Sequence, residues 1–192
     1  MRALAQEPGH SASNLFVVAA FIRAAKLSDI DSIAHVHVAS WHAAYRGIIP
    51  DEQIDARTIE RRRSQWASNL QGANRITLIA HDGQGTVQGF ASALLLDGSD
   101  GGFGSYLEML YLLPEAQRRG IGGQLLHALW TKIRAIGVNN MSLRTLRLGA
   151  ARAFYEHVGA RIVPEGIATG AGHFDDVVYA FDDLGDLAER LM

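Results

Sequence analysis

The chain has 192 residues, with 18 Lys and Arg against 20 Asp and Glu, so its formal net charge is −2. No overall positive field therefore points to nucleic acid. The chain contains no cysteine, which excludes disulfide scaffolds, thiolate zinc sites, iron–sulfur clusters and cysteine nucleophiles.

The N-terminal region opens with a polar segment, residues 1–14, followed by an apolar run, residues 15–22. The run is either a signal peptide or a first strand, and Arg23, where a signal needs a small-residue cleavage site, favours the strand. No apolar stretch approaches the roughly 18 residues of a transmembrane helix. We expect a leader or N-terminal extension at 1–20, one domain at 21–184 and a C-terminal tail at 185–192.

Two helices are predicted after the first strand. Apolar residues recur at helical spacing from Ile30 to Tyr45, with Ser28 as the expected cap and Gly47 as the stop. A second helix is expected over residues 50–70.

The remaining elements follow from alternation and turn residues. The predicted strands are 76–80, 86–96, 106–113, 138–147, 161–164 and 176–181, and the predicted helices are 120–137 and 150–158. A glycine-rich loop at 166–172 separates the last two strands. The order β-α-α-β-β-β-α-β-α-β-β predicts a single α/β (α+β) domain.

A basic, glycine-rich turn between strand 106–113 and helix 120–137 is the most informative segment. Helix N-termini carry unpaired N–H groups and positive dipole ends, so the turn could hold an anion. A Walker A loop is excluded because no Lys followed by Ser or Thr occurs here. A dinucleotide fingerprint would need glycine where Leu125 stands, which weakens that interpretation.

Three blocks in chain order resemble the GNAT superfamily of acetyl-CoA-dependent acyltransferases. Gln117-Arg118-Arg119-Gly120-Ile121-Gly122 matches its [Q/R]-x-x-G-x-[G/A] signature, and residues 151–159, ARAFYEHVG, resemble its A-x-x-F-Y-E-x-x-G segment. Residues 40–52, SWHAAYRGIIPDE, resemble the first-helix region of one branch. The likeness spans about residues 21–182.

The resemblance implies a mixed, mostly antiparallel central sheet flanked by helices and an N-acetyltransferase that uses acetyl-CoA as co-substrate, without a metal. It implies a small-molecule or peptide amine as acceptor, a cytoplasmic location and a possible homodimer, with no nucleic-acid or membrane partner. The implied cofactor contacts are Leu110, Tyr111, Leu112, Gln117, Arg118, Arg119, Gly120, Ile121, Gly122, Gly123 and Gln124.

Tyr155 is the candidate general acid, because a phenol with pKa near 10 can protonate a departing thiolate and stay protonated at neutral pH. The alternative is ordinary aromatic packing. Glu108, on the same predicted face as Leu110, is either a base or a charge that faces solvent or pairs with an arginine. Tyr106, on that face too, is a candidate for the acceptor site.

Trp41 and Tyr45 lie four residues apart on one helical face and are either acceptor-pocket walls or core anchors. Three histidines in the same helix lack the common face and the carboxylate that a metal site would need, which argues against a metal.

Two charge clusters accompany these aromatic residues. The basic run at Arg57, Arg61, Arg62 and Arg63 favours a solvated helix face over a nucleic-acid site. The acidic residues Asp51, Glu52 and Asp55 indicate either a cationic acceptor or an ordinary helix start.

Two positions depart from the family pattern. Leu148 stands where the family often has an asparagine that bonds the cofactor, and Ala160 replaces a common aromatic residue. Leu148 keeps open a non-catalytic acyl-CoA sensor or interaction module on the same fold.

Overall fold

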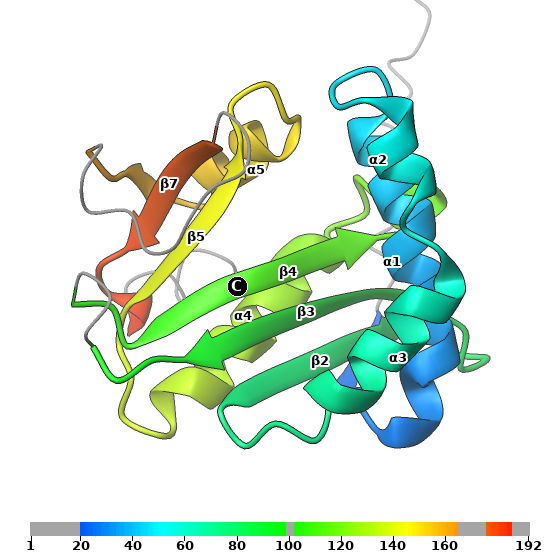
Figure 1. Cartoon of the computed structure of the whole chain (residues 1–192). Coiled ribbons are helices and arrows are strands. Elements are labelled where there is room, and N and C mark those ends of the chain that lie inside the picture. The colour runs from blue at the N-terminus through cyan, green and yellow to red at the C-terminus, as the bar shows by residue number, and fades with distance from the viewer. Residues whose placement is uncertain (1–19, 99–101, 165–175, 186–192) are drawn as a thin grey trace, which may run out of the picture.

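The computed structural model describes residues 20–98, 102–164 and 176–185. Within them a 7-stranded sheet has the order β1-β2-β3-β4-β5-β7-β6 (Figure 1). The strands are β1 Phe21–Ala24, β2 Arg75–His81, β3 Val87–Leu95, β4 Ser105–Leu112, β5 Met141–Leu146, β6 Arg161–Ile162 and β7 Asp176–Phe181. Among these strands β4 and β5 form the one parallel pair, which confirms the predicted mixed, mostly antiparallel sheet.

Helices cover both faces of the sheet. They are α1 Ile30–Tyr45, α2 Asp51–Asp55, α3 Ile59–Asn69, α4 Ile121–Arg134 and α5 Ala151–His157. Helix α4 packs against β2, β3 and β4, while α1 packs against β3, β4 and α3 (Figure 1). His37 of α1 and Trp66 of α3 both contact Phe90 of β3, so these two helices share one face.

Helix α4 forms where the sequence predicts the long amphipathic helix. Its buried face is apolar at three- and four-residue spacing, with Leu125, Leu129 and Ile133 fully buried. Gly120 precedes the helix with a φ of 79°, a left-handed conformation that glycine adopts without steric cost. This start places the predicted anion-binding turn at the end of β4.

The predicted second helix is wrong in one respect, because residues 50–70 form two helices. Thr58 is extended and caps α3, its hydroxyl accepting a hydrogen bond from the N–H of Arg61 at 3.3 Å. The predicted cap at Ser28 is also wrong. Ser28 lies in a 3-10 turn, and the carboxylate of Asp29 accepts the Lys26 N–H at 2.7 Å instead.

Strand β4 contains a β-bulge. Ser92 of β3 pairs with Met109, and the next residue, Ala93, pairs with Leu107, so Glu108 is the extra residue. A bulge reverses the side-chain alternation beyond it. The expectation that Glu108 and Leu110 share a face is therefore wrong.

The register shows which face each β4 residue occupies. Tyr106 pairs with Leu94, and Tyr111 pairs with Phe90, so both lie on the face covered by α1 and α3. Leu110 pairs with Ala91 and lies on the opposite face. The bulge thus brings Tyr106 and Tyr111 to the same face although their sequence separation is odd.

In the part of the chain that the structure describes, no helix is both long and apolar enough to cross a membrane. Residues 1–19 of the expected leader, the loop 166–172 and residues 186–192 of the expected tail lie outside the described residues.

Candidate active site

Within the described residues, the end of β4 has no paired strand on its β5 side. β4 pairs with β5 only at Tyr106 and Leu107, whereas its pairing with β3 continues to Leu112. Figure 1 shows the two strands diverging beyond this point. The edge of β4 from Glu108 to Leu112 is therefore available to an extended ligand.

The turn that follows β4 presents main-chain donors. Arg118 has a φ of 58°, the one positive value among the described non-glycine residues. The first hydrogen bond into α4 runs from the Gln124 N–H to the Gly120 carbonyl at 3.1 Å. Within the described segments the N–H groups from Arg118 to Gly123 have no hydrogen-bond partner. They form a cradle suited to a phosphate.

Side chains around this turn leave the cradle open. Gln117, Arg118 and Arg119 are exposed, and the amide of Gln117 donates to the Leu112 carbonyl at 3.3 Å. A Cβ atom added at Gly122 would lie 3.4 Å from the Leu112 side chain and 3.6 Å from Phe154 of α5. Gly122 is therefore at the point where β4, α4 and α5 meet.

Four tyrosines from three elements converge beside the open edge of β4. Tyr155 of α5 is electrostatically coupled to Tyr45 of α1 and Tyr106 of β4, and Tyr111 of β4 is coupled to Tyr45. Burial raises the pKa of all four phenols. The group therefore holds its protons at neutral pH.

Tyr155 is the most deeply placed of the sequence-predicted catalytic residues. Its side chain is 7 % exposed, and its ring lies 5.3 Å from that of Phe154 and 6.4 Å from that of Tyr179. Burial is the main cause that raises its pKa far above the ordinary value, followed by Tyr45 and Tyr106. A phenol in this state holds its proton at neutral pH.

Glu108 is held by an ion pair. Its carboxylate contacts the guanidinium of Arg75 on β2, which also donates to the Ser92 hydroxyl at 3.2 Å. The Ser92 hydroxyl in turn bonds Thr77 at 3.0 Å. Glu108 is thus fixed on the α1 and α3 face, next to Tyr106 and Tyr111.

Trp41 and Tyr45 are half-buried, and their rings make contacts on the protein surface. Their rings pack against each other with centroids 4.3 Å apart. The guanidinium carbon of Arg57, in the segment between α2 and α3, lies 3.8 Å from the Trp41 ring centroid. The two rings therefore pack against each other outside the main hydrophobic core, with Arg57 over Trp41.

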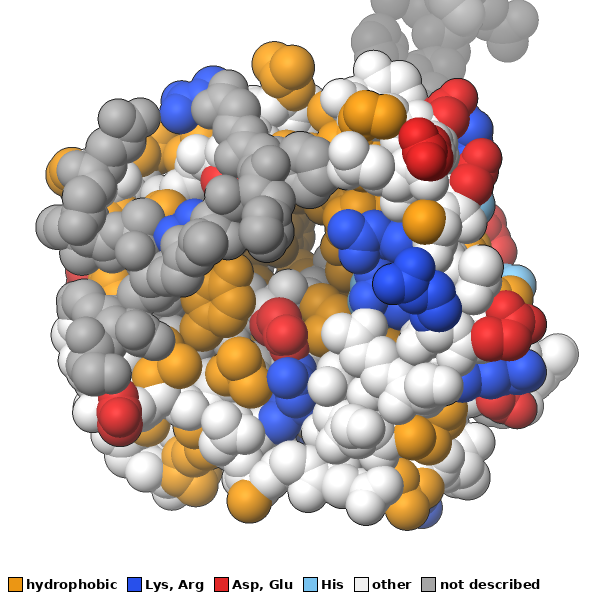
Figure 2. Space-filling view, in the orientation of Figure 1, with side chains coloured by type: hydrophobic (Ala, Val, Ile, Leu, Met, Phe, Trp, Pro, Cys, Tyr) orange, Lys and Arg blue, Asp and Glu red, His pale blue; other side chains and the backbone are white. Residues whose placement is uncertain are grey.

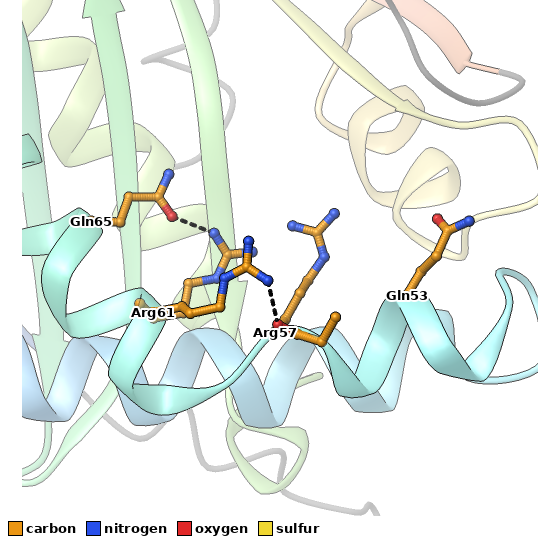
Figure 3. A pocket seen from close by; sticks show the side chains of 6 residues that line it. Gln53, Arg57, Arg61 and Gln65 are labelled. Atoms are coloured by element: carbon orange, nitrogen blue, oxygen red, sulfur yellow. Dashed lines mark hydrogen bonds between the residues drawn. The ribbon is translucent and has the colours of Figure 1, made fainter.

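Arg57, Arg61 and Arg62 surround a cavity of about 590 Å³, whose lining is completed by Gln53, Ala56 and Gln65. Figure 3 shows Gln53 of α2 and Arg57, from the segment between α2 and α3, projecting to the same side of the backbone. Figure 2 shows basic side chains gathered beside a hollow in this face of the molecule. The solvated-face interpretation of the basic run is wrong for Arg62, which is 8 % exposed because it shares the buried face of α3 with Trp66.

His37 is a core residue rather than a ligand. It is 2 % exposed, stacks on Tyr111 at 5.0 Å and accepts a hydrogen bond from the Trp66 indole at 3.2 Å. Burial, together with Arg62 and Arg57, lowers its pKa to about 3. Within the described residues no group of histidines and carboxylates is placed to hold a metal ion.

The sequence does not predict the side-chain contacts of several residues in this region. Arg75 is far from Glu108 in the chain, so no local pattern predicts their ion pair. The face on which the Tyr111 side chain lies depends on the bulge. Arg62 could have been recognised, because it lies four residues before the buried Trp66. Leu148 is 79 % exposed, and Ala160 donates its N–H to the Tyr155 carbonyl at 2.9 Å.

Comparison with known proteins agrees with this geometry. A family model described as an acetyltransferase (GNAT) domain matches residues 73–159. The uncharacterized N-acetyltransferase YuaI of Bacillus subtilis (strain 168) is 30 % identical over 172 residues, which cover 88 % of this chain and 97 % of the relative.

Solved structures share the fold at lower identity. The PaiA N-acetyltransferase of Thermoplasma acidophilum, in complex with coenzyme A, has a TM-score of 0.71 at 21 % identity, covering 84 % of this chain and 98 % of its own. The aminoglycoside 6'-acetyltransferase type Ii has a TM-score of 0.61 at 19 % identity, covering 85 % and 97 %. With the extensive likeness to YuaI and the matching domain model, the chain belongs to the GNAT acetyltransferase family and is an acyltransferase.

Proposed function

We propose that the protein transfers an acetyl group from acetyl-CoA to a primary amine by direct attack of the amine on the thioester. The observation that carries the proposal is the open edge of β4, which ends in the unpartnered N–H groups from Arg118 to Gly123. Bound coenzyme A in the similar PaiA structure supports this choice of co-substrate. The absence of cysteine leaves direct transfer as the simplest route.

The chain has suitable groups for each part of acetyl-CoA. The N–H groups of the turn and the exposed Arg118 and Arg119 would bind the diphosphate, since main-chain donors and guanidinium groups both suit phosphate oxygens. Leu110, Tyr111 and Leu112 would pair with the extended arm as an added strand. The Leu110 N–H would then donate to the thioester oxygen as negative charge develops there.

Tyr155 would protonate the sulfur as the thiolate departs. Its burial and its raised pKa keep it protonated, and its electrostatic coupling to Tyr106 of β4 supports this role. Glu108 would accept the proton of the attacking amine through water, because Arg75 already occupies its carboxylate directly. Trp41, Tyr45 and Tyr106 would form the wall that positions the amine.

The similar aminoglycoside acetyltransferase supports small-molecule acceptors on this fold. The test is to incubate the protein with acetyl-CoA and a panel of primary amines and to follow the release of free thiol. We expect release that requires both an amine and the protein. Saturable binding of acetyl-CoA without release on any amine would contradict the proposal and would instead favour a non-catalytic acyl-CoA sensor.

A further inference from the structure

The cavity between α2 and α3 has an unusual charge balance. Among the described residues, its lining includes three guanidinium groups and two side-chain amides but no carboxylate. Its volume of about 590 Å³ is in the range that holds small ligands. A cavity of this kind is suited to an anion.

The three arginines of the cavity have no acidic partner among the described residues. Arg61 donates to the Ala56 carbonyl at 3.0 Å, and Arg62 donates to the Gln65 side chain. Arg57 stacks on Trp41, and its Nε atom is buried without a hydrogen-bond partner. Their donors therefore meet neutral groups or none.

Neighbouring arginines, in contrast, are paired. Arg63, on the same helix as Arg61 and Arg62, contacts Asp31 at 2.7 Å. Arg46 contacts Asp51 at 3.2 Å and Asp55 at 2.9 Å. The lack of a counter-charge is thus a property of the cavity and not of this part of the surface.

Burial makes the unpaired charges costly. Burial is the main cause that lowers the pKa of both Arg57 and Arg62, and the neighbouring arginines lower it further. A bound anion would relieve this repulsion and supply the missing acceptors. Guanidinium groups bind carboxylates and phosphates through paired hydrogen bonds.

The cavity adjoins the residues assigned to the acceptor. Arg57 contacts Trp41 and is electrostatically coupled to Tyr45 and Tyr111. Arg62 is coupled to Tyr111 and Glu108. An anionic group in the cavity would therefore lie beside the wall that positions the amine.

The acidic run does not oppose this assignment. Asp51 and Asp55, which suggested a cationic acceptor, are both occupied by Arg46. In the described part of the chain, the side chains beside the acceptor wall that have no ion-pair partner are the positively charged Arg57, Arg61 and Arg62.

We propose that the acceptor is a small amine that also carries an anionic group, a carboxylate or a phosphate, which Arg57, Arg61 and Arg62 bind. The inference rests on the proposed acetyl transfer to an amine. It narrows the acceptor to molecules in which the amine and the anion are close enough to occupy adjoining sites.

The experiment compares matched amines that differ in the anion. The pairs are β-alanine with β-alaninamide and O-phosphoethanolamine with ethanolamine, each assayed by thiol release at constant pH and ionic strength. We expect the anionic member of at least one pair to have a kcat/KM higher by about tenfold or more. The pair with the larger ratio identifies carboxylate or phosphate as the preferred group.

Two variants locate the effect. In Arg57→Gln/Arg61→Gln we expect the KM for the anionic amine to rise about tenfold and that for acetyl-CoA to stay unchanged. Arg63→Gln, on the same helix but paired with Asp31 outside the cavity, is the control and should keep both values. Arg62 is left intact because its burial makes it important for folding.

Three outcomes would overturn the inference. The first is a kcat/KM that is the same for the anionic and the neutral amine in both pairs. The second is an Arg57→Gln/Arg61→Gln variant in which the KM for acetyl-CoA rises and the KM for the amine does not. If no amine releases thiol, acetyl transfer itself fails, and isothermal titration with glutarate and with inorganic phosphate still tests the cavity. Saturable binding that Arg57→Gln/Arg61→Gln abolishes would support an anion site, while the absence of binding would be the third contradicting result.

Discussion

The turn before α4 and the cavity between α2 and α3 both present positive charge, but they do so by different means. In the turn, the charge comes from main-chain N–H groups that a helix start leaves unpaired. In the cavity, it comes from three side chains carried by α3 and the segment before it. The first arrangement depends on backbone conformation, whereas the second depends on the identity of three side chains.

Three predictions test the difference between the turn and the cavity. They concern Tyr155, then His37, whose electrostatic neighbours include Arg57 and Arg62 of the cavity, and then Gly122 in the turn.

The largest effect is expected at Tyr155, where the two regions meet. Tyr155→Phe removes the proton donor and keeps the ring, so we expect kcat to fall about a hundredfold with the KM for acetyl-CoA unchanged. Thiol release at saturating substrates measures the change. Tyr179→Phe is the matched control, because that hydroxyl bonds Arg152 and Glu156 instead. An unaltered kcat in Tyr155→Phe would remove the general-acid role.

The stability of the protein is expected to decrease in acid because of His37, which is hydrogen-bonded to Trp66 on the helix that carries Arg61 and Arg62. The pKa of His37 is lowered to about 3 in the folded protein, below the ordinary value of 6.5, so the unfolded chain binds the extra proton between these values. The free energy of unfolding should therefore decrease by about 1.4 kcal/mol for each pH unit below 6.5. Denaturant titrations at pH 6.5 and 5 would measure this slope.

His37→Gln should reduce that slope, because glutamine does not titrate and its oxygen can still accept the Trp66 N–H. His35→Gln, at an exposed position of the same helix, is the control and should keep the slope. The same slope in His37→Gln and in the unaltered protein would show that His37 does not resist protonation.

The smallest of the three effects is expected in the main-chain region. Gly122→Val adds a Cβ that would contact Leu112 and Phe154, and two methyl groups beyond it, so we expect acetyl-CoA affinity to fall about tenfold. Titration calorimetry measures the affinity, and thermal unfolding shows whether the fold is retained. Gly122→Ala adds only the Cβ at ordinary contact distance and should bind acetyl-CoA nearly normally. Undiminished affinity in the folded valine variant would separate Gly122 from the cofactor site.

The difference between the main-chain turn and the side-chain cavity also explains how much of each the sequence could predict. Strand β4, the glycine turn and α4 are contiguous in the chain, so local patterns predict all three. Tyr111 lies on the face of Tyr106 only because a bulge shifts the register of β4, and nothing near Glu108 indicates a bulge. Arg75 and Glu108 pair across the sheet from positions far apart in the chain. The sequence therefore predicts the main-chain site better than the side-chain site.

The region of α2 and α3 shows the same limit. The break at Thr58 was missed because a capping hydroxyl within a helix-compatible sequence looks like any other polar residue. Once α3 begins there, Arg62 lies on the face with Trp66 and is buried. The number of arginines in this segment predicts a solvated helix face. That number carries no information about which side of the helix faces the sheet.

Hydrogen exchange measured by mass spectrometry, with and without acetyl-CoA, tests the central claim most directly. The claim is that main-chain groups of β4 and the glycine turn hold acetyl-CoA, and that the arginine cavity serves the acceptor. We predict slower exchange at 108–112 and 118–123 on adding acetyl-CoA, with unchanged exchange at 57–65. Unchanged exchange at 118–123, or protection centred on 57–65, would contradict the account.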